Sequence, residues 1–340
     1  MGYWAIKDKL ARGDAVLVDG GIGTEILRRG VYWRCHGLEQ HPEVVAQVHA
    51  DYRAAGAEVL KTDTFQLNRR AYLNLFHGIE HMRRIGPQGL EHKAGLLTRQ
   101  AVALARQAAN GSAGSGGSPH PARPPGQAGE ATTQAGQASQ AAQPTPAVAG
   151  VISPLEHCFR PDLSPPAAQC RAEYDELVGD MKAAGADFIL FESMNRVEEA
   201  RTAAEAARDA GLPVWVSFVV RNDGNILGHE PLAEAVKALE PLGVDVIAVN
   251  CAPLDDITRA VAELRRHRTG PIGAWAHIGR YDPPSWKFGF YPRFSGAEAV
   301  PPARYLEAAR EWKRIGAQVI GGCCGTTPEH IRALRHGVGM

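Results

Sequence analysis

The chain has 340 residues, 44% of them hydrophobic, so it can bury the core of one large domain or of two ordinary ones. Lys and Arg together number 37, as do Asp and Glu, and this balance leaves no basic field that would make nucleic acid an expected partner. Because the N-terminus lacks the apolar core of a signal peptide, and no stretch reaches the roughly 20 apolar residues of a membrane span, we expect a cytoplasmic protein without a membrane partner.

Eight apolar runs along the chain are typical of buried strands. Four of them share one pattern, a glycine and a small apolar residue before the run, and they begin at Gly56, Gly185, Gly243 and Gly316. The other four cover residues 15–21, 148–154, 213–220 and 271–278. Each glycine can cap a preceding helix in the left-handed conformation, so the repeated unit is a helix followed by a strand.

Helical faces precede three of these runs. The apolar residues recur at helical spacing, and the three sets are Val44, Val48 and Tyr52; Tyr174, Val178 and Met181; and Tyr305, Ala309 and Trp312. Eight alternating units match a single (β/α)8 TIM barrel in number and size. A doubly wound sheet is the alternative, but no GxGxxG or GxxxxGK[ST] sequence follows any of the strands.

Residues 110–147 interrupt the pattern. They contain no Val, Ile, Leu, Met, Phe, Trp or Tyr, and their only charged residues are Arg123 and Glu130. Such a segment cannot bury enough apolar surface to offset its ordering entropy, so it is predicted to be a disordered insertion within one barrel domain spanning residues 1–340. A tether for a partner protein is the alternative role.

Polar and reactive residues recur at one depth in the repeated units. Seven residues beyond the four glycines lie Asp63, Glu192, Asn250 and Cys323, and eight residues beyond them lie Thr64, Ser193, Cys251 and Cys324. Asp19 and His277 take similar places on the first and seventh strands. In a barrel these positions meet at the carboxyl ends of the strands, where active sites are built.

Three of these residues are cysteines. Cys251 follows the sixth strand, and Cys323 and Cys324 follow the eighth, so their thiolates can surround one Zn²⁺ and leave its fourth position open to a substrate. Buried or reactive thiols remain an equal alternative, since no CxxC sequence is present. Cys35, Cys158 and Cys170 have no ligand-like neighbours and are interpreted as ordinary small residues.

Five segments of the chain form a recognisable pattern: DGGIGTEILRRG (19–30), HPEVVAQVHADYRAAGAEVLKTDTF (41–65), FESMNRVEEA (191–200), VNCAP (249–253) and GGCCGTTPEHI (321–331). With these segments the chain resembles the homocysteine S-methyltransferase family. The resemblance implies a (β/α)8 barrel that transfers a methyl group from a small donor to the thiol of homocysteine, giving methionine. It also implies Zn²⁺ held by Cys251, Cys323 and Cys324, and a homocysteine site at Asp19, Gly20, Gly21 and Glu192. No protein nucleophile is expected, because the metal-bound thiolate attacks the methyl group.

The ammonium of an amino-acid substrate needs a carboxylate, which suits Glu192; pairing of Glu192 with an internal Lys or Arg is the alternative. Betaine-using members of the family place tyrosines where this chain has Gln66 and Ser193, which favours S-methylmethionine or S-adenosylmethionine over betaine as the donor. The turn HIG (277–279) also departs from the family pattern. A separate corrinoid protein as methyl source, and a non-catalytic zinc or amino-acid binding barrel, are left open as alternatives.

Overall fold

The computed structural model describes residues 2–31, 35–70, 79–112, 144–282, 293–295 and 300–339. Eight parallel strands form its centre, in the order β1-β10-β7-β6-β5-β4-β3-β2. A parallel bridge between Val18 and Val59 joins the two end strands and closes the ring. The strands are β1 (Val16–Leu17), β2 (Val59–Lys61), β3 (Ala147–Ile152), β4 (Phe188–Met194), β5 (Val214–Val219), β6 (Val246–Asn250), β7 (Ile272–Trp275) and β10 (Val319–Ile320). The predicted TIM barrel is therefore confirmed, and the chain is not a doubly wound sheet.

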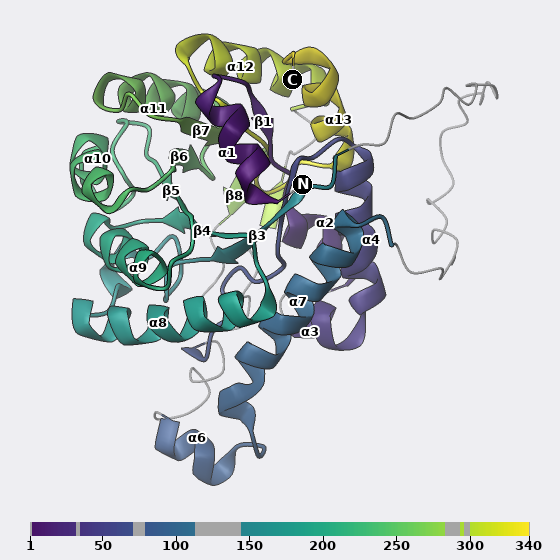
Figure 1. Cartoon of the computed structure of the whole chain (residues 1–340), viewed down its shortest axis with the longest axis vertical. Coiled ribbons are helices and arrows are strands. Elements are labelled where there is room, and N and C mark those ends of the chain that lie inside the picture. Colours follow the sequence, from purple (N-terminus) through teal and green to yellow (C-terminus); the bar gives the residue numbers. More distant parts are fainter. Residues whose placement is uncertain are drawn as a thin grey trace, which may run out of the picture.

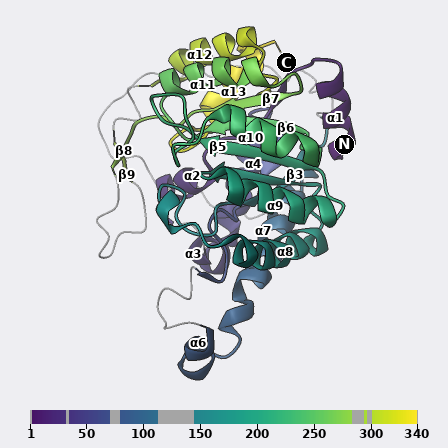
Figure 2. The ribbon, with the colours of Figure 1, turned by 90° about the vertical axis from the view of Figure 1, so that its left-hand side faces the viewer.

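Helices surround this ring, and Figure 1 shows α8 to α12 following one another around the outside of the strands. The described α-helices are α1 (Tyr3–Ala11), α2 (Ile22–Arg28), α3 (Cys35–Gln40), α4 (Pro42–Ala54), α6 (Ile79–Ile85), α7 (Lys93–Ala109), α8 (Ala167–Ala184), α9 (Val197–Asp209), α10 (Leu232–Leu239), α11 (Leu254–His267), α12 (Pro302–Ile315) and α13 (Pro328–Gly337). Figure 2 shows α6 projecting away from the body of the molecule. Within the described ranges, no helix combines the length and apolarity needed to cross a membrane.

The predicted helix caps and faces are largely present. Gly185 and Gly316 end α8 and α12 with left-handed backbone, as expected for glycine after a helix. The two predicted faces on α8 and α12 are fully buried. On α4 the buried residues are Val45, Val48, His49 and Tyr52. Two of the three residues predicted for this face, Val48 and Tyr52, are therefore buried, whereas Val44 is only partly buried.

Two apolar layers hold the barrel together. One packs the strands against the helices, and the other fills the interior of the ring. Helix α1 closes the amino-terminal end of that interior: Tyr3 stacks on Phe188 and accepts a hydrogen bond from the indole of Trp215 at 2.9 Å. The interior is therefore sealed at one end, and the opposite, carboxyl end carries the polar residues.

The predicted insertion lies between α7 and β3. Residues 113–143 of it fall outside the described residues, and β3 begins at Ala147, one residue earlier than the predicted strand. A short antiparallel pair, β8 (Arg280–Asp282) with β9 (Arg293–Ser295), follows β7 and has no counterpart in the sequence prediction.

Candidate metal and substrate site

Three cysteines meet at the carboxyl end of the barrel. The sulfur atoms of Cys251, Cys323 and Cys324 all lie within 4.8 Å of one another, and those of Cys251 and Cys324 are 4.0 Å apart. Cys251 and Cys323 are buried, and Cys324 is partly exposed. The spacing of the sequence motif therefore brings together the three predicted side chains, although they come from loops after two different strands.

The arrangement fits a thiolate-bound metal ion. Sulfurs bound to one tetrahedral Zn²⁺ at about 2.3 Å would lie about 3.8 Å apart, which agrees with the observed separations. Hydrogen bonds from the thiols of Cys251 and Cys324 hold the pKa of Cys323 well below its usual range. The side-chain amide of Asn250 lies 3.9 Å from the same sulfur and points its nitrogen at it. A cluster that already favours a thiolate has the donor chemistry that zinc prefers.

One cysteine of the cluster and two other residues of the pocket lining have strained backbone. Among the described residues, four that are not glycine have positive φ, and three of them line the mouth: Gln66 at 56°, Ser193 at 63° and Cys251 at 52°. Side chains rarely adopt this conformation, and such residues concentrate at functional sites. Ser193 also coincides with a break in the register between β4 and β5, which redirects the end of β4.

Hydroxyl groups tie the loop after β10 to the loop after β1. Thr326 donates to the carbonyl oxygen of Cys323 at 2.6 Å and accepts from the backbone N–H of Gly21 at 3.2 Å. Thr24 accepts from the backbone N–H of Gly325 at 2.9 Å, and Tyr52 donates to the carbonyl oxygen of Thr326 at 2.9 Å. These contacts fix the backbone that carries two of the three thiols.

The unusual HIG turn also supports the cysteines. The N–H of Ile278 donates to the carbonyl oxygen of Cys324 at 2.9 Å, and the N–H of His277 donates to that of Ala252 at 3.1 Å. The turn thus connects the loop after β6 with the loop after β10. Whatever the family pattern at this position, in this chain the turn holds the backbone of the cysteine cluster in place.

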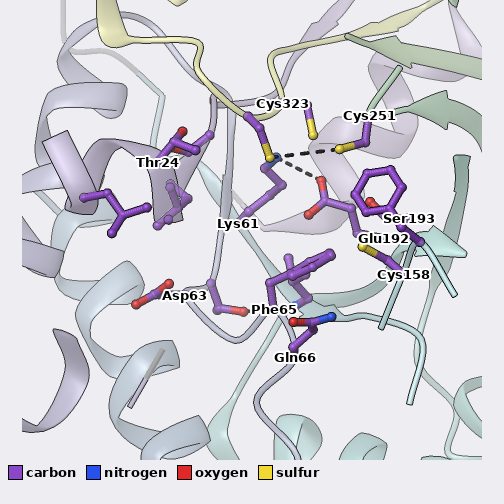
Figure 3. A pocket seen from close by; sticks show the side chains of 18 of the residues that line it. Thr24, Lys61, Asp63, Phe65, Gln66, Cys158, Glu192, Ser193, Cys251 and Cys323 are labelled. Atoms are coloured by element: carbon purple, nitrogen blue, oxygen red, sulfur yellow. Dashed lines mark hydrogen bonds and ion pairs between the residues drawn. The ribbon is translucent and has the colours of Figure 1, made fainter. Parts of the chain in front are cut away.

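Beside the cysteines lies a buried ion pair. The Lys61 ammonium donates to Glu192 Oε1 at 2.9 Å (Figure 3). It also donates to the carbonyl oxygen of Gly322 at 3.3 Å and lies 3.8 Å from Asp19 Oδ1. The indole of Trp275 donates to the same Glu192 oxygen at 3.0 Å. Burial disfavours the charge of Lys61, but Glu192 and Asp19 outweigh it and raise the pKa of the ammonium. Glu192 therefore has an internal cation as its partner, which was the alternative role considered for it.

Asp19 lies deeper than Glu192. It is fully buried, its Oδ2 accepts from the backbone N–H of Lys61 at 2.8 Å, and burial raises its pKa to about 8. Of the predicted substrate residues, Glu192 and Gly21 line the pocket at the mouth of the barrel, while Asp19 and Gly20 lie behind that lining. A methyl group on Gly20 would clash with the ring and hydroxyl of Tyr52, the nearest atom at 2.6 Å, which explains the glycine there.

The pocket contains one more carboxylate. Asp63 lines its wall, is only 2% exposed, and has an Oδ2 atom with no hydrogen-bond partner in the part of the chain that the structure describes. Burial raises the pKa of Asp63 to about 7. A buried carboxylate without a partner is costly, so this group is best satisfied by a ligand that brings a positive charge.

Several predicted residues take other roles. Cys158 lines the pocket and Cys170 is buried on α8; neither belongs to the cluster of three. The side chain of Cys35 lies outside the described residues. Lys61 and Trp275 were not predicted from the sequence as partners of Glu192. Side chains alternate between the two faces of a strand, so Lys61 lies on the same face of β2 as Val59, which packs in the barrel interior. This alternation could have indicated that Lys61 points into the barrel.

A comparison with known families gives the family to which the chain belongs. The family model described as homocysteine S-methyltransferase matches residues 16–338. The chain belongs to the homocysteine S-methyltransferase family. It is accordingly a methyltransferase, and homocysteine S-methyltransferase is the activity that the family supports.

Members of this family from several organisms match the chain over most of their length. The homocysteine S-methyltransferase YbgG of Bacillus subtilis is 27% identical and covers 94% of this chain, which spans 93% of that protein. The homocysteine S-methyltransferase of Escherichia coli is 27% identical, with 97% of each chain covered. The S-methylmethionine–homocysteine S-methyltransferase of Rattus norvegicus is 25% identical over 97% of this chain and 80% of its own.

Solved structures agree on the fold. The metallated form of the homocysteine methyltransferase MmuM from Escherichia coli superposes with a TM-score of 0.72 at 23% identity, covering 97% of this chain and 98% of that one. Its oxidised form gives a TM-score of 0.70. At this level of identity the likeness supports the TIM barrel and no finer property.

Proposed function

We propose that this family member uses Zn²⁺ bound by Cys251, Cys323 and Cys324 to methylate the thiol of homocysteine, and that the methyl donor is a small sulfonium compound. The observation that carries the proposal is the cluster of three sulfurs within 4.8 Å at the wall of a pocket. When bound there, Zn²⁺ supplies an acceptor thiol that is ionised at neutral pH and so is nucleophilic.

In the reaction, the thiolate sulfur of homocysteine forms a bond to the methyl carbon of the donor. The bond from that carbon to the donor sulfonium breaks, and its electron pair stays on the leaving sulfur, which becomes a neutral thioether. No proton and no redox partner enters the transfer step. The protein binds both reactants in the pocket at the mouth of the barrel and aligns them, which by itself can lower the activation barrier substantially.

The acceptor site would be formed by Asp19, Gly20, Gly21 and Glu192. Glu192 and Gly21 face the pocket directly. Asp19 lies behind the pocket lining and would act through Lys61. Its carboxylate accepts from the backbone N–H of Lys61 and lies 3.8 Å from the Lys61 ammonium. The N–H of Gly21 is already donated to Thr326, so in this proposal Gly21 shapes the pocket by the absence of a side chain.

The donor site would be formed around Asp63. Its buried carboxylate supplies the negative charge that a sulfonium needs, and it lies on the same pocket wall as Phe65 and Gln66. Gln66 and Ser193 occupy the positions where tyrosines favour betaine, and the hydroxyl of Ser193 accepts from Asn250 at 2.7 Å. The absence of tyrosines at these two positions supports S-methylmethionine or S-adenosylmethionine over betaine.

Turnover of homocysteine with a donor panel tests the proposal. Purified protein with its metal would be assayed for methionine with S-methylmethionine, S-adenosylmethionine, betaine and a methyl-corrinoid protein. We expect product from a sulfonium donor. Product only with the methyl-corrinoid would overturn the donor assignment in favour of a corrinoid partner, and no product with any donor, despite bound zinc, would favour a binding protein.

The donor site has its own variant. Asp63→Asn keeps the shape and removes the charge, and we expect it to raise the KM for the sulfonium donor about tenfold or more while leaving zinc content unchanged. Asp8→Asn is the matched control, since Asp8 is exposed on α1 at the far end of the barrel. An unchanged donor KM in a folded Asp63→Asn protein would remove Asp63 from the donor site.

A further inference from the structure

A cation of the protein already occupies the acidic end of the acceptor site. Lys61 extends from the end of β2 into the barrel interior, and its ammonium lies between Glu192 Oε1, at 2.9 Å, and Asp19 Oδ1, at 3.8 Å. These are the two carboxylates of the acceptor site in the proposed function, and they are the groups there that could pair with the ammonium of homocysteine. Lys61 is only 4% exposed and lines the pocket, so the ammonium is held inside the site.

The contacts of Lys61 leave it little freedom. One donor is directed at Glu192, a second at the carbonyl oxygen of Gly322 at 3.3 Å, and the remaining side of the ammonium faces Asp19. The Glu192 oxygen that accepts from Lys61 also accepts from Trp275 at 3.0 Å. A buried ammonium with these partners is costly to displace, because it would leave two carboxylates without a counter-ion.

We propose that Lys61 determines acceptor specificity by serving as an internal substitute for the substrate ammonium. The inference rests on the proposed function and concerns which thiols that site accepts. Two carboxylates share one ammonium before any substrate enters, and a second ammonium placed beside Lys61 would meet like charge at short range. The enzyme therefore gains little from the α-amino group of homocysteine, and it methylates thiol acids that lack this group, such as 4-sulfanylbutanoate, with similar efficiency.

The test compares two acceptors that differ only in the α-amino group. With the sulfonium donor fixed, kcat/KM is measured for homocysteine and for 4-sulfanylbutanoate in the wild type and in Lys61→Met. We expect the ratio of the two values to lie within about threefold of one in the wild type. In Lys61→Met the unpaired carboxylates should favour the substrate ammonium, and the ratio should rise in favour of homocysteine by about tenfold or more.

Binding gives a second readout that does not depend on turnover. Homocysteine should raise the melting temperature of metal-loaded Lys61→Met more than 4-sulfanylbutanoate does, whereas the two ligands should act alike on the wild type. Lys237→Met is the matched control, because Lys237 is exposed on α10. That variant should keep the wild-type ratio.

A double variant keeps the test valid if Lys61→Met alone is poorly stable, because it also removes the charge that Lys61 neutralises. Lys61→Met with Glu192→Gln removes one charge of each sign, so the ratio should return to the wild-type value. A wild-type preference for homocysteine above tenfold, or an unchanged ratio in Lys61→Met, would overturn the inference. Failure of the proposed function would look different, since neither thiol would then be methylated by any of the four proteins.

Discussion

At the scale of single residues, Glu192 illustrates that a carboxylate at a strand end can pair either with a substrate or with a cation of the protein itself. Its position at the strand end suited a substrate ammonium, and an internal Lys or Arg was the other reading. The structure gives it Lys61 at 2.9 Å and the indole of Trp275 at 3.0 Å. A substitution at Glu192 therefore affects the folded protein as well as the ligand.

We predict that Glu192→Gln lowers the free energy of unfolding by about 2 kcal/mol, because a hydrogen bond to a charged group becomes a neutral one and Lys61 loses its nearest countercharge. Urea denaturation of the metal-loaded protein measures this. Glu198→Gln is the control, since Glu198 is exposed on α9 and should change stability by less than about 0.5 kcal/mol. Equal stability of the two variants would contradict a stabilising Lys61–Glu192 pair.

The cysteines make a prediction about metal content. We expect about one Zn²⁺ per chain in the wild type, and loss of most of it in Cys251→Ala, because two thiolates cannot complete the site. Cys170→Ala is the matched control: Cys170 is also a buried thiol, but it lies on α8, outside the cluster. Metal analysis of the purified proteins decides the point, and full occupancy in Cys251→Ala would remove that residue from the ligand set.

At the scale of elements, the loops after β1 and β10 behave as one unit. A methyl group on Gly21 would lie 2.6 Å from the hydroxyl of Thr24 and 2.7 Å from the carbonyl oxygen of Cys323. Contacts this short force the backbone to move, and the backbone concerned carries two of the three proposed metal ligands. The close approach of the two loops thus depends on the glycine.

We therefore predict that Gly21→Ala lowers zinc affinity by about tenfold or more, within the range seen when groups supporting a metal site are lost. A competition titration with a chelator measures it. Gly179→Ala is the control, because Gly179 lies inside α8 with open space around its Cα, and alanine there should stabilise the protein by about 0.5–1 kcal/mol. Wild-type affinity in Gly21→Ala would show that the loop accommodates the methyl group.

The strands could be predicted from the sequence because the signals for each strand lie close to it in the chain. A helix face, a capping glycine and an apolar run lie within one short stretch, as at Gly185 and Gly316. The interior partners could not be predicted in the same way. Lys61 and Glu192 are 131 positions apart, and nothing near Lys61 in the sequence indicates that its ammonium reaches across the barrel.

At the scale of the whole molecule, the parts outside the repeated units were the least predictable. The packing of α1 across the barrel end depends on Tyr3 reaching Trp215 and Asp245, contacts that no periodicity encodes. The pair β8–β9 likewise joins two segments that lack a strand-like apolar run. The fold class could be predicted because it follows from counting units, whereas these additions follow from individual side chains.

The insertion allows a prediction for the whole chain. Because residues 113–143 contain no large apolar side chain, we expect that replacing them with a short flexible linker leaves zinc content unchanged and the melting temperature within a few degrees. Thermal denaturation and metal analysis of the shortened protein test this. A large drop in melting temperature would mean that the segment contributes to the packed fold.

The circular order of the strands has a consequence for synthesis on the ribosome. β1 pairs with β10, so the first strand to be synthesised can form this pairing only after the last strand has been synthesised. Cys251 emerges after six strands, but Cys323 and Cys324 emerge only after all eight. A nascent chain that stops short of β10 can neither close the ring nor assemble three thiolates, so metal loading would distinguish finished barrels from truncated ones.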